Sequence, residues 1–222
     1  MSVQTEGMRL GDWLKWEVDN QYSRDVVTIL AGSGSERALT TGMVLGRVTK
    51  GAAVGAAVAG NSGDGTITAA PAVGQAAKPG VYRVVCIEPA TNGGKFAVED
   101  PDGVLVGIAA VGTEFATQLT FTIADGDADF AAGDAFTITV AAGSGKVVQI
   151  DFSATDGSNV ACGLLTEPTT ASDGADRSAV AVVRNAIVSA NGITWPAGAT
   201  TNQKSAAIAQ LKSLGILVRE GA

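Results

Sequence analysis

The chain has 222 residues, 46% of them hydrophobic but only 5% aromatic, and its 29 glycines are typical of many short strands joined by tight turns. It contains no histidine, which excludes Ser-His, Cys-His and His-metal chemistry, so we expect no enzymatic activity, no metal and no cofactor. Its net charge of −7 is confined to residues 56–144, where ten acidic residues face three basic ones. Such a surface repels phosphate and no basic stripe lies elsewhere, so we expect no nucleic-acid binding.

The N-terminal stretch places two tryptophans among charged residues. A helical period would put Leu10, Trp13, Leu14 and Val18 on one face and leave Trp16 on the opposite side. The strict alternation of apolar and charged residues from Leu14 onward favours an extended segment instead. Two interpretations stay open: the tryptophans pack into the core of their own module, or they anchor an arm to a partner.

Runs rich in β-branched and aromatic residues, bounded by turn residues, predict a series of strands. In chain order they span residues 25–30, 42–49, 80–89, 94–100, 103–111, 117–125, 134–142, 146–152, 158–165 and 178–190. Two glycine-rich stretches, residues 50–65 and 141–146, are typical of connectors.

The connectors and the uneven charge together predict a domain inserted into another. We expect an N-terminal arm over residues 1–22 and a discontinuous body over 23–55 and 145–222. Residues 56–144 then form an inserted, acidic, β-sandwich-like domain.

One helix is predicted near the C-terminal end, over residues 201–214. Thr200 and Gln203 fit the reciprocal capping pattern, and Gly215 fits the position just after the helix. A strand over residues 216–220 follows. The expected fold class is therefore mainly β with one C-terminal α-helix.

Cys86 and Cys162 lie in separate apolar runs and are interpreted as buried free thiols. No apolar run reaches the roughly 20 residues of a membrane helix, and the start of the chain lacks a secretory pattern, so we expect a soluble protein made in the cytoplasm. Asp125, Asp127 and Asp129 have the spacing of a calcium loop. Phenylalanine replaces the required glycine and glutamate of that loop, which favours an acidic hairpin loop.

Four segments resemble the head decoration proteins of tailed bacteriophages, the family that includes the decoration protein of phage lambda. They are "TEGMRLGDWLKWEVDNQYSRDVVTILAGSG", "VLGRVTKG", "DFSATDGSNVACGLLTEPT" and "ITWPAGATTNQKSAAIAQLKSLGILVRE". The resemblance covers residues 5–50 and 146–219. The stretch "NGGKFAVEDPDG" resembles β-modules inserted in longer members.

This resemblance implies a structural virion protein on the outer surface of the expanded capsid, assembled in the host cytoplasm. Homotrimers at threefold and quasi-threefold positions would clamp the major capsid protein against the pressure of packaged DNA. The capsid-facing residues it implies are Arg9, Leu10, Trp13, Leu14, Trp16, Val18, Tyr22, Trp195 and Pro196. The acidic insert, by its composition, would project outward as a solvated knob.

A second function class rests on the insert alone. β-sandwiches often bind carbohydrate, so the insert could bind glycans on a host surface. Exposed aromatic side chains on one face would indicate such a sugar platform. The aromatic residues available to it are Tyr82, Phe96, Phe115, Phe121, Phe130 and Phe136.

Overall fold

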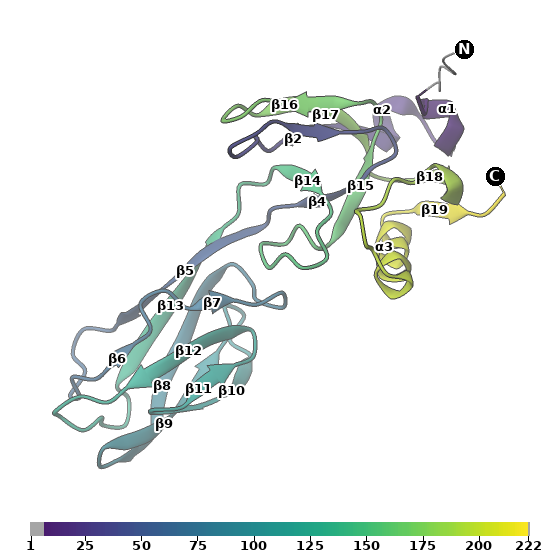
Figure 1. Ribbon diagram of the computed structural model, residues 1–222. Coiled ribbons are helices and arrows are strands. Elements are labelled where there is room, and N and C mark those ends of the chain that lie inside the picture. The colour runs from purple at the N-terminus through teal and green to yellow at the C-terminus, as the bar shows by residue number, and fades with distance from the viewer. Residues whose placement is uncertain (1–6, 222) are drawn as a thin grey trace. The chain divides into compact units, whose positions relative to one another are not determined.

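The computed structural model describes residues 7–221, which form two compact units (Figure 1). Unit 1 comprises Met1–Val48 and Gly145–Ala222, and unit 2 comprises Thr49–Ser144. The N-terminal junction lies seven residues before the expected one, because Lys50–Ala57 is not a connector. It forms strand β5, which pairs with β13 (Ala135–Ala142) inside unit 2. Small residues suit this strand, whose Ala53 packs into the core of unit 2.

Unit 1 is built around a closed five-stranded barrel. Its order is β14 (Val147–Gln149), β2 (Arg24–Ile29), β17 (Arg177–Val182), β15 (Ala161–Leu165) and β4 (Val44–Arg47). The strands β3 (Arg37–Leu39) and β16 (Thr169–Ala171) form a separate pair. The barrel is filled by Val27, Ile29, Leu45, Leu165 and their neighbours.

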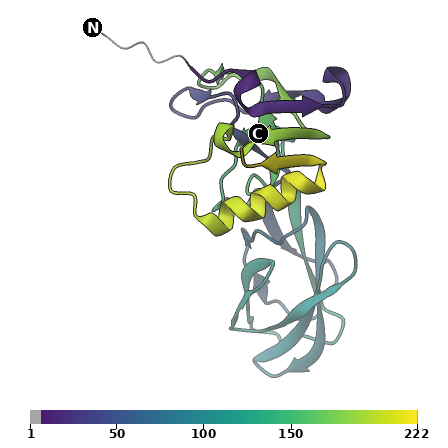
Figure 2. The ribbon, with the colours of Figure 1, turned by 90° about the vertical axis from the view of Figure 1, so that its right-hand side faces the viewer.

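A second sheet of unit 1 joins a strand near the start of the chain to two strands near its end. Its order is β1 (Leu14–Glu17), β18 (Ala186–Ser189) and β19 (Ile216–Arg219). The single strand expected over 178–190 is interrupted, because Asn185 adopts a left-handed φ of 44° and β17 and β18 enter different sheets. Figure 2 shows the N-terminal segment, β18, β19 and the C-terminal helix in that order.

The C-terminal helix α3 (Thr201–Ser213) has the predicted cap. The Thr200 hydroxyl accepts a hydrogen bond from the Gln203 N–H, and the Gln203 side chain accepts one from the Thr200 N–H. Ala207 and Leu211 are fully buried in the core that α3 shares with the three-stranded sheet. Three shorter helices, α1 (Leu10–Trp13), α2 (Asn20–Ser23) and the 3-10 helix η1 (Ala190–Gly192), complete unit 1.

Unit 2 has two sheets around one core, the arrangement of a β-sandwich. Five strands follow the order β10 (Leu105–Ala110), β9 (Gly93–Glu99), β8 (Gly80–Ala90), β13 and β5. The other sheet contains β11 (Glu114–Ala116), β12 (Leu119–Ala124) and β6 (Thr66–Ile67), with β7 (Ala72–Val73) paired to β12. The short strands β6, β7 and β11 were not expected from the sequence.

The observed fold confirms the predicted class, mainly β with one helix of regular length near the C-terminal end. Across the described residues, 7–221, no helix combines the length and apolar character needed to cross a membrane.

Candidate partner-binding surface

Trp13 is a core residue of unit 1. Its side chain is fully buried beside Val188, Leu211 and Ile216. The indole Nε1–H donates a hydrogen bond of 2.9 Å to the Thr41 hydroxyl. Trp13 was expected at the capsid-facing surface, but the structure places it where only its own body contacts it. Trp13 therefore fits the other interpretation, in which the tryptophans pack into the core of their own module.

Trp16 has the opposite environment, with 53% of its surface exposed. The two residues differ because α1 ends at Trp13 and β1 begins at Leu14, so each competing periodicity applies to its own part of the segment. In β1, Trp16 lies opposite Ile187 of β18, and Ile187 lies opposite Leu217 of β19. Directly paired side chains share one face of a sheet. Trp16, Ile187 and Leu217 therefore form an apolar row, called here the Trp16 row.

The opposite face of the same sheet is the core face, since Ala186, Val188 and Ile216 are almost completely buried. The Trp16 row thus lies on the outer face of the sheet. Ile187 is half-buried and Leu217 is 37% exposed. An exposed aromatic flanked by two aliphatic side chains is a surface typical of protein-protein contacts.

Polar contacts hold the segment that follows the row. Glu17, at the end of β1, accepts two hydrogen bonds from the Arg24 guanidinium, at 2.5 and 2.9 Å. These hydrogen bonds raise the pKa of the Arg24 guanidinium above its usual value. Arg184 lies 5.6 Å from the centre of the Tyr22 ring and also donates 2.9 Å to Asp25 Oδ2. Tyr22 stays 51% exposed, so this cation–π contact orients a ring that faces solvent.

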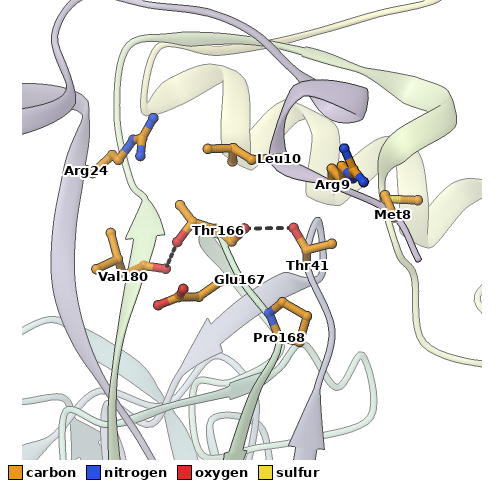
Figure 3. Close-up of a pocket in the computed structure, with 9 residues that line it drawn as sticks. All are labelled: Met8, Arg9, Leu10, Arg24, Thr41, Thr166, Glu167, Pro168 and Val180. Atoms are coloured by element: carbon orange, nitrogen blue, oxygen red, sulfur yellow. Dashed lines mark hydrogen bonds between the residues drawn. The ribbon is translucent and has the colours of Figure 1, made fainter. Parts of the chain in front are cut away.

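A pocket of about 500 Å³ lies beside the N-terminal segment (Figure 3). Nine residues line it: Met8, Arg9, Leu10, Arg24, Thr41, Thr166, Glu167, Pro168 and Val180. Hydrogen bonds fix part of its wall, because the Thr41 hydroxyl donates 2.8 Å to the Thr166 carbonyl and the Thr166 hydroxyl donates 2.7 Å to the Val180 carbonyl. Of the residues predicted to face the capsid, Arg9 and Leu10 border this pocket.

The remaining predicted residues are divided between surface and interior. Val18 is 55% exposed, whereas Leu14 is half-buried against the core of unit 1. Trp195 packs on that same core and is also half-buried. Pro196 borders a different pocket of about 390 Å³, with Arg37 and Asp151, which shares no lining residue with the first.

Two residues of the candidate surface, Ile187 and Leu217, were missed by the sequence analysis. Each lies in a predicted strand whose alternation places it opposite a buried neighbour. The sequence does not show that β1, β18 and β19 pair with one another, because the three strands are distant in sequence.

Two cysteines and the acidic loop lie outside this surface. Burial raises the pKa of both cysteine thiols, Cys86 and Cys162, which lowers their reactivity. Both are free, and Cys162 is only half-buried. In the acidic loop, Asp129 accepts a hydrogen bond from the Asn92 N–H. Among residues 7–221, no group of three or more histidine, cysteine, aspartate or glutamate side chains is placed to hold a metal ion.

The aromatic residues of unit 2 are all interior. Tyr82 and the five phenylalanines, Phe96, Phe115, Phe121, Phe130 and Phe136, are at most 8% exposed. Phe96 contacts both Phe130 and Phe136, with ring centres 5.0 and 5.7 Å apart. These rings build the core and offer no aromatic platform for a sugar.

Fold and surface define a two-unit β-rich protein with an exposed apolar row of the kind that binds other proteins. Residues 3–216 match the family model of bacteriophage lambda head decoration protein D. The chain therefore belongs to this family of phage capsid decoration proteins, which are structural rather than catalytic.

No curated protein matches the chain. Among solved structures, two crystal forms of Xanthomonas campestris FlgL are similar to it at 19% identity and a TM-score of 0.32. The similarity covers 49% of this chain and 34% and 33% of the two FlgL chains.

Proposed function

We propose that the protein binds the outside of the expanded phage capsid as homotrimers at threefold and quasi-threefold positions. There it contacts the major capsid protein and holds the shell against the pressure of the packaged DNA. Family membership supports the capsid as the site of action. The observation that carries the proposal is the Trp16 row. It is an exposed apolar surface on unit 1, where most of the other large apolar side chains are buried or half-buried.

Within this function, Trp16 is the anchor and Leu217 and Ile187 flank it. Tryptophan is enriched among the few interface residues that supply most of the binding energy, because it buries a large apolar surface at little entropic cost. Val18 and Tyr22 are exposed beyond β1 and extend the contact. Three such contacts in one trimer act together, since after the first attachment the others dock at a high effective concentration.

The inserted unit has another place in this proposal. We expect unit 2 to point away from the shell, where its excess of acidic residues is solvated. Glycan binding by this unit was the alternative function, and no observation favours it, because its aromatic side chains are interior.

The test is co-sedimentation with undecorated, expanded heads of the phage concerned. Trp16→Ala should weaken saturable binding by about 2 kcal/mol or more per subunit, the scale of an interface hot spot. Val160→Ala is the matched control, because Val160 is 46% exposed on unit 1 but lies outside the three-stranded sheet. Equal binding by both variants would remove the Trp16 row from the interface, and no binding by the unaltered protein would refute the capsid function.

A further inference from the structure

The five-stranded sheet of unit 2 has an outer face that the function above does not use. Its inner face packs into the core through Tyr82, Phe96, Ile138 and other buried residues. Because side chains alternate along a strand, the remaining residues of the same strands lie on the outer face. Large apolar side chains are exposed there: Val54 (60%), Val81 (47%), Leu105 (58%) and Ile108 (54%).

The strand register places these residues in two groups on the face. Val81 of β8 and Val54 of β5 both lie opposite Thr139 of β13, one on each side. At the other edge of the sheet, Ile108 of β10 lies opposite Ala97 of β9. The exposed large apolar side chains thus lie on three of the five strands, β5, β8 and β10, rather than on one. Several exposed apolar side chains on one face of a sheet are typical of an interaction surface.

Charge is distributed on this face differently from the rest of unit 2. Thr49–Ser144 contains ten acidic and four basic residues, a net charge of −6. On the outer face, Arg83 of β8 lies directly opposite Glu99 of β9. Beyond a bulge in the same pair of strands, Lys95 and Glu88 form an ion pair of 2.8 Å. The face is therefore neutral within an acidic unit.

From this arrangement we propose that the outer face of the unit 2 sheet binds the same face of a second copy of the chain. Two copies repel each other through most of the acidic surface of unit 2 and can approach through its neutral face. In a twofold contact, a residue that meets another across the interface is met by it in return. A central pair of opposite charges is complementary to itself under this symmetry, so Arg83 of one copy faces Glu99 of the other.

The experiment measures self-association of the full-length protein by sedimentation velocity over a range of concentrations. Arg83→Glu places two acidic residues on both faces, and Glu99→Arg places two basic residues there, so each variant alone should associate at least tenfold more weakly. An equimolar mixture of the two variants should associate again, because the residues at positions 83 and 99 are then both basic on one face and both acidic on the other. Each chain in the mixture still carries its own like-charged pair. Recovered association must therefore come from contacts between the two different chains.

Two further variants test whether association depends on the outer face or on nearby exposed residues. Ile108→Asp should weaken association, whereas Val58→Asp, at a valine that is 40% exposed just beyond β5, should leave it unchanged. Near-ultraviolet circular dichroism and melting temperature establish that each variant is folded. Any assembly through unit 1 is common to all variants and does not respond to these changes. The proposal is overturned if the sedimentation coefficient of the unaltered protein does not rise with concentration. It is also overturned if Arg83→Glu associates as strongly as the unaltered protein, or if the mixture of the two variants does not recover association.

Discussion

At the scale of single residues, Trp13 and Trp16 are three positions apart and have opposite roles. Trp13 fills the interior of unit 1, and the backbone of η1 approaches it so closely that a Cβ at Gly192 would overlap the Trp13 Cβ. Only glycine fits at position 192. Trp16 is held on the outer face by the pairing of β1 with β18. The same residue type therefore contributes stability at one position and an exposed apolar surface at the other.

A pair of substitutions separates these roles. Trp13→Ala should lower the free energy of unfolding of unit 1 by about 3–5 kcal/mol, because it leaves a large cavity. It also leaves the Thr41 hydroxyl without its indole donor. Trp16→Ala, at an exposed side chain, should change that free energy by only about 0.5 kcal/mol. Urea denaturation followed by tryptophan fluorescence measures both, since all three tryptophans lie in unit 1. Similar losses in the two variants would contradict the assignment.

At the scale of elements, one carboxylate connects the loop after β5 to the start of β13. Asp134 is 95% buried and accepts hydrogen bonds from the N–H groups of Ser62 (2.8 Å), Gly63 (2.8 Å) and Ala131 (2.9 Å). Burial acts to raise the pKa of Asp134, but the three donors outweigh it and hold the pKa below its usual value of 3.8. The ionised carboxylate therefore stabilises the folded loop.

This contact predicts the acid sensitivity of unit 2. A carboxyl whose pKa is lower in the folded state contributes stability that is present above about pH 4 and is lost as pH falls through its folded pKa. Amide hydrogen exchange at Ser62 and Gly63 should accelerate below about pH 4, relative to the intrinsic rate at each pH. Asp134→Asn should flatten this dependence, whereas Asp127→Asn, at an exposed side chain in the preceding loop, should retain it. A pH dependence that survives Asp134→Asn would assign the effect to another group.

At the scale of the whole molecule, the chain leaves and re-enters unit 1 at adjacent points. The Val48 N–H donates 2.9 Å to the Lys146 carbonyl, and the Gly145 N–H donates 2.9 Å to the Val48 carbonyl. Beside them, β4 and β14 pair in antiparallel register, with Val147 opposite Arg47. A two-residue turn can join the two ends of such a pair.

Replacing Thr49–Ser144 by Asn-Gly should therefore leave unit 1 folded and, on the proposed function, able to bind the shell. The expected change in its free energy of unfolding is within about 1 kcal/mol, because closing a shorter loop costs no more entropy than closing a longer one. Circular dichroism and urea denaturation measure the fold, and co-sedimentation with expanded heads measures binding. Loss of binding by a folded deletion variant would make unit 2 part of the interface with the shell.

Local patterns in the sequence determined much of this fold. The capping residues Thr200 and Gln203 predicted where α3 begins, and alternation predicted most of the longer strands, because both depend on neighbours within a few positions. The interruption of the strand over 178–190 at Asn185 was not predicted, since nothing local required it. Glycine and alanine likewise concealed β5, which is a strand only because β13 lies beside it.

For the candidate surface, the sequence by itself singled out the N-terminal tryptophans as either core residues or anchors to a partner. It also showed that the chain resembles phage decoration proteins. Which tryptophan is exposed was decided by the tertiary structure, because burial depends on the partners that a side chain meets. The Trp16 row joins three strands from the two ends of the chain, and the neutral face of unit 2 joins five more. Such surfaces depend on strand register, which is fixed by contacts between distant segments and is not encoded in any one of them.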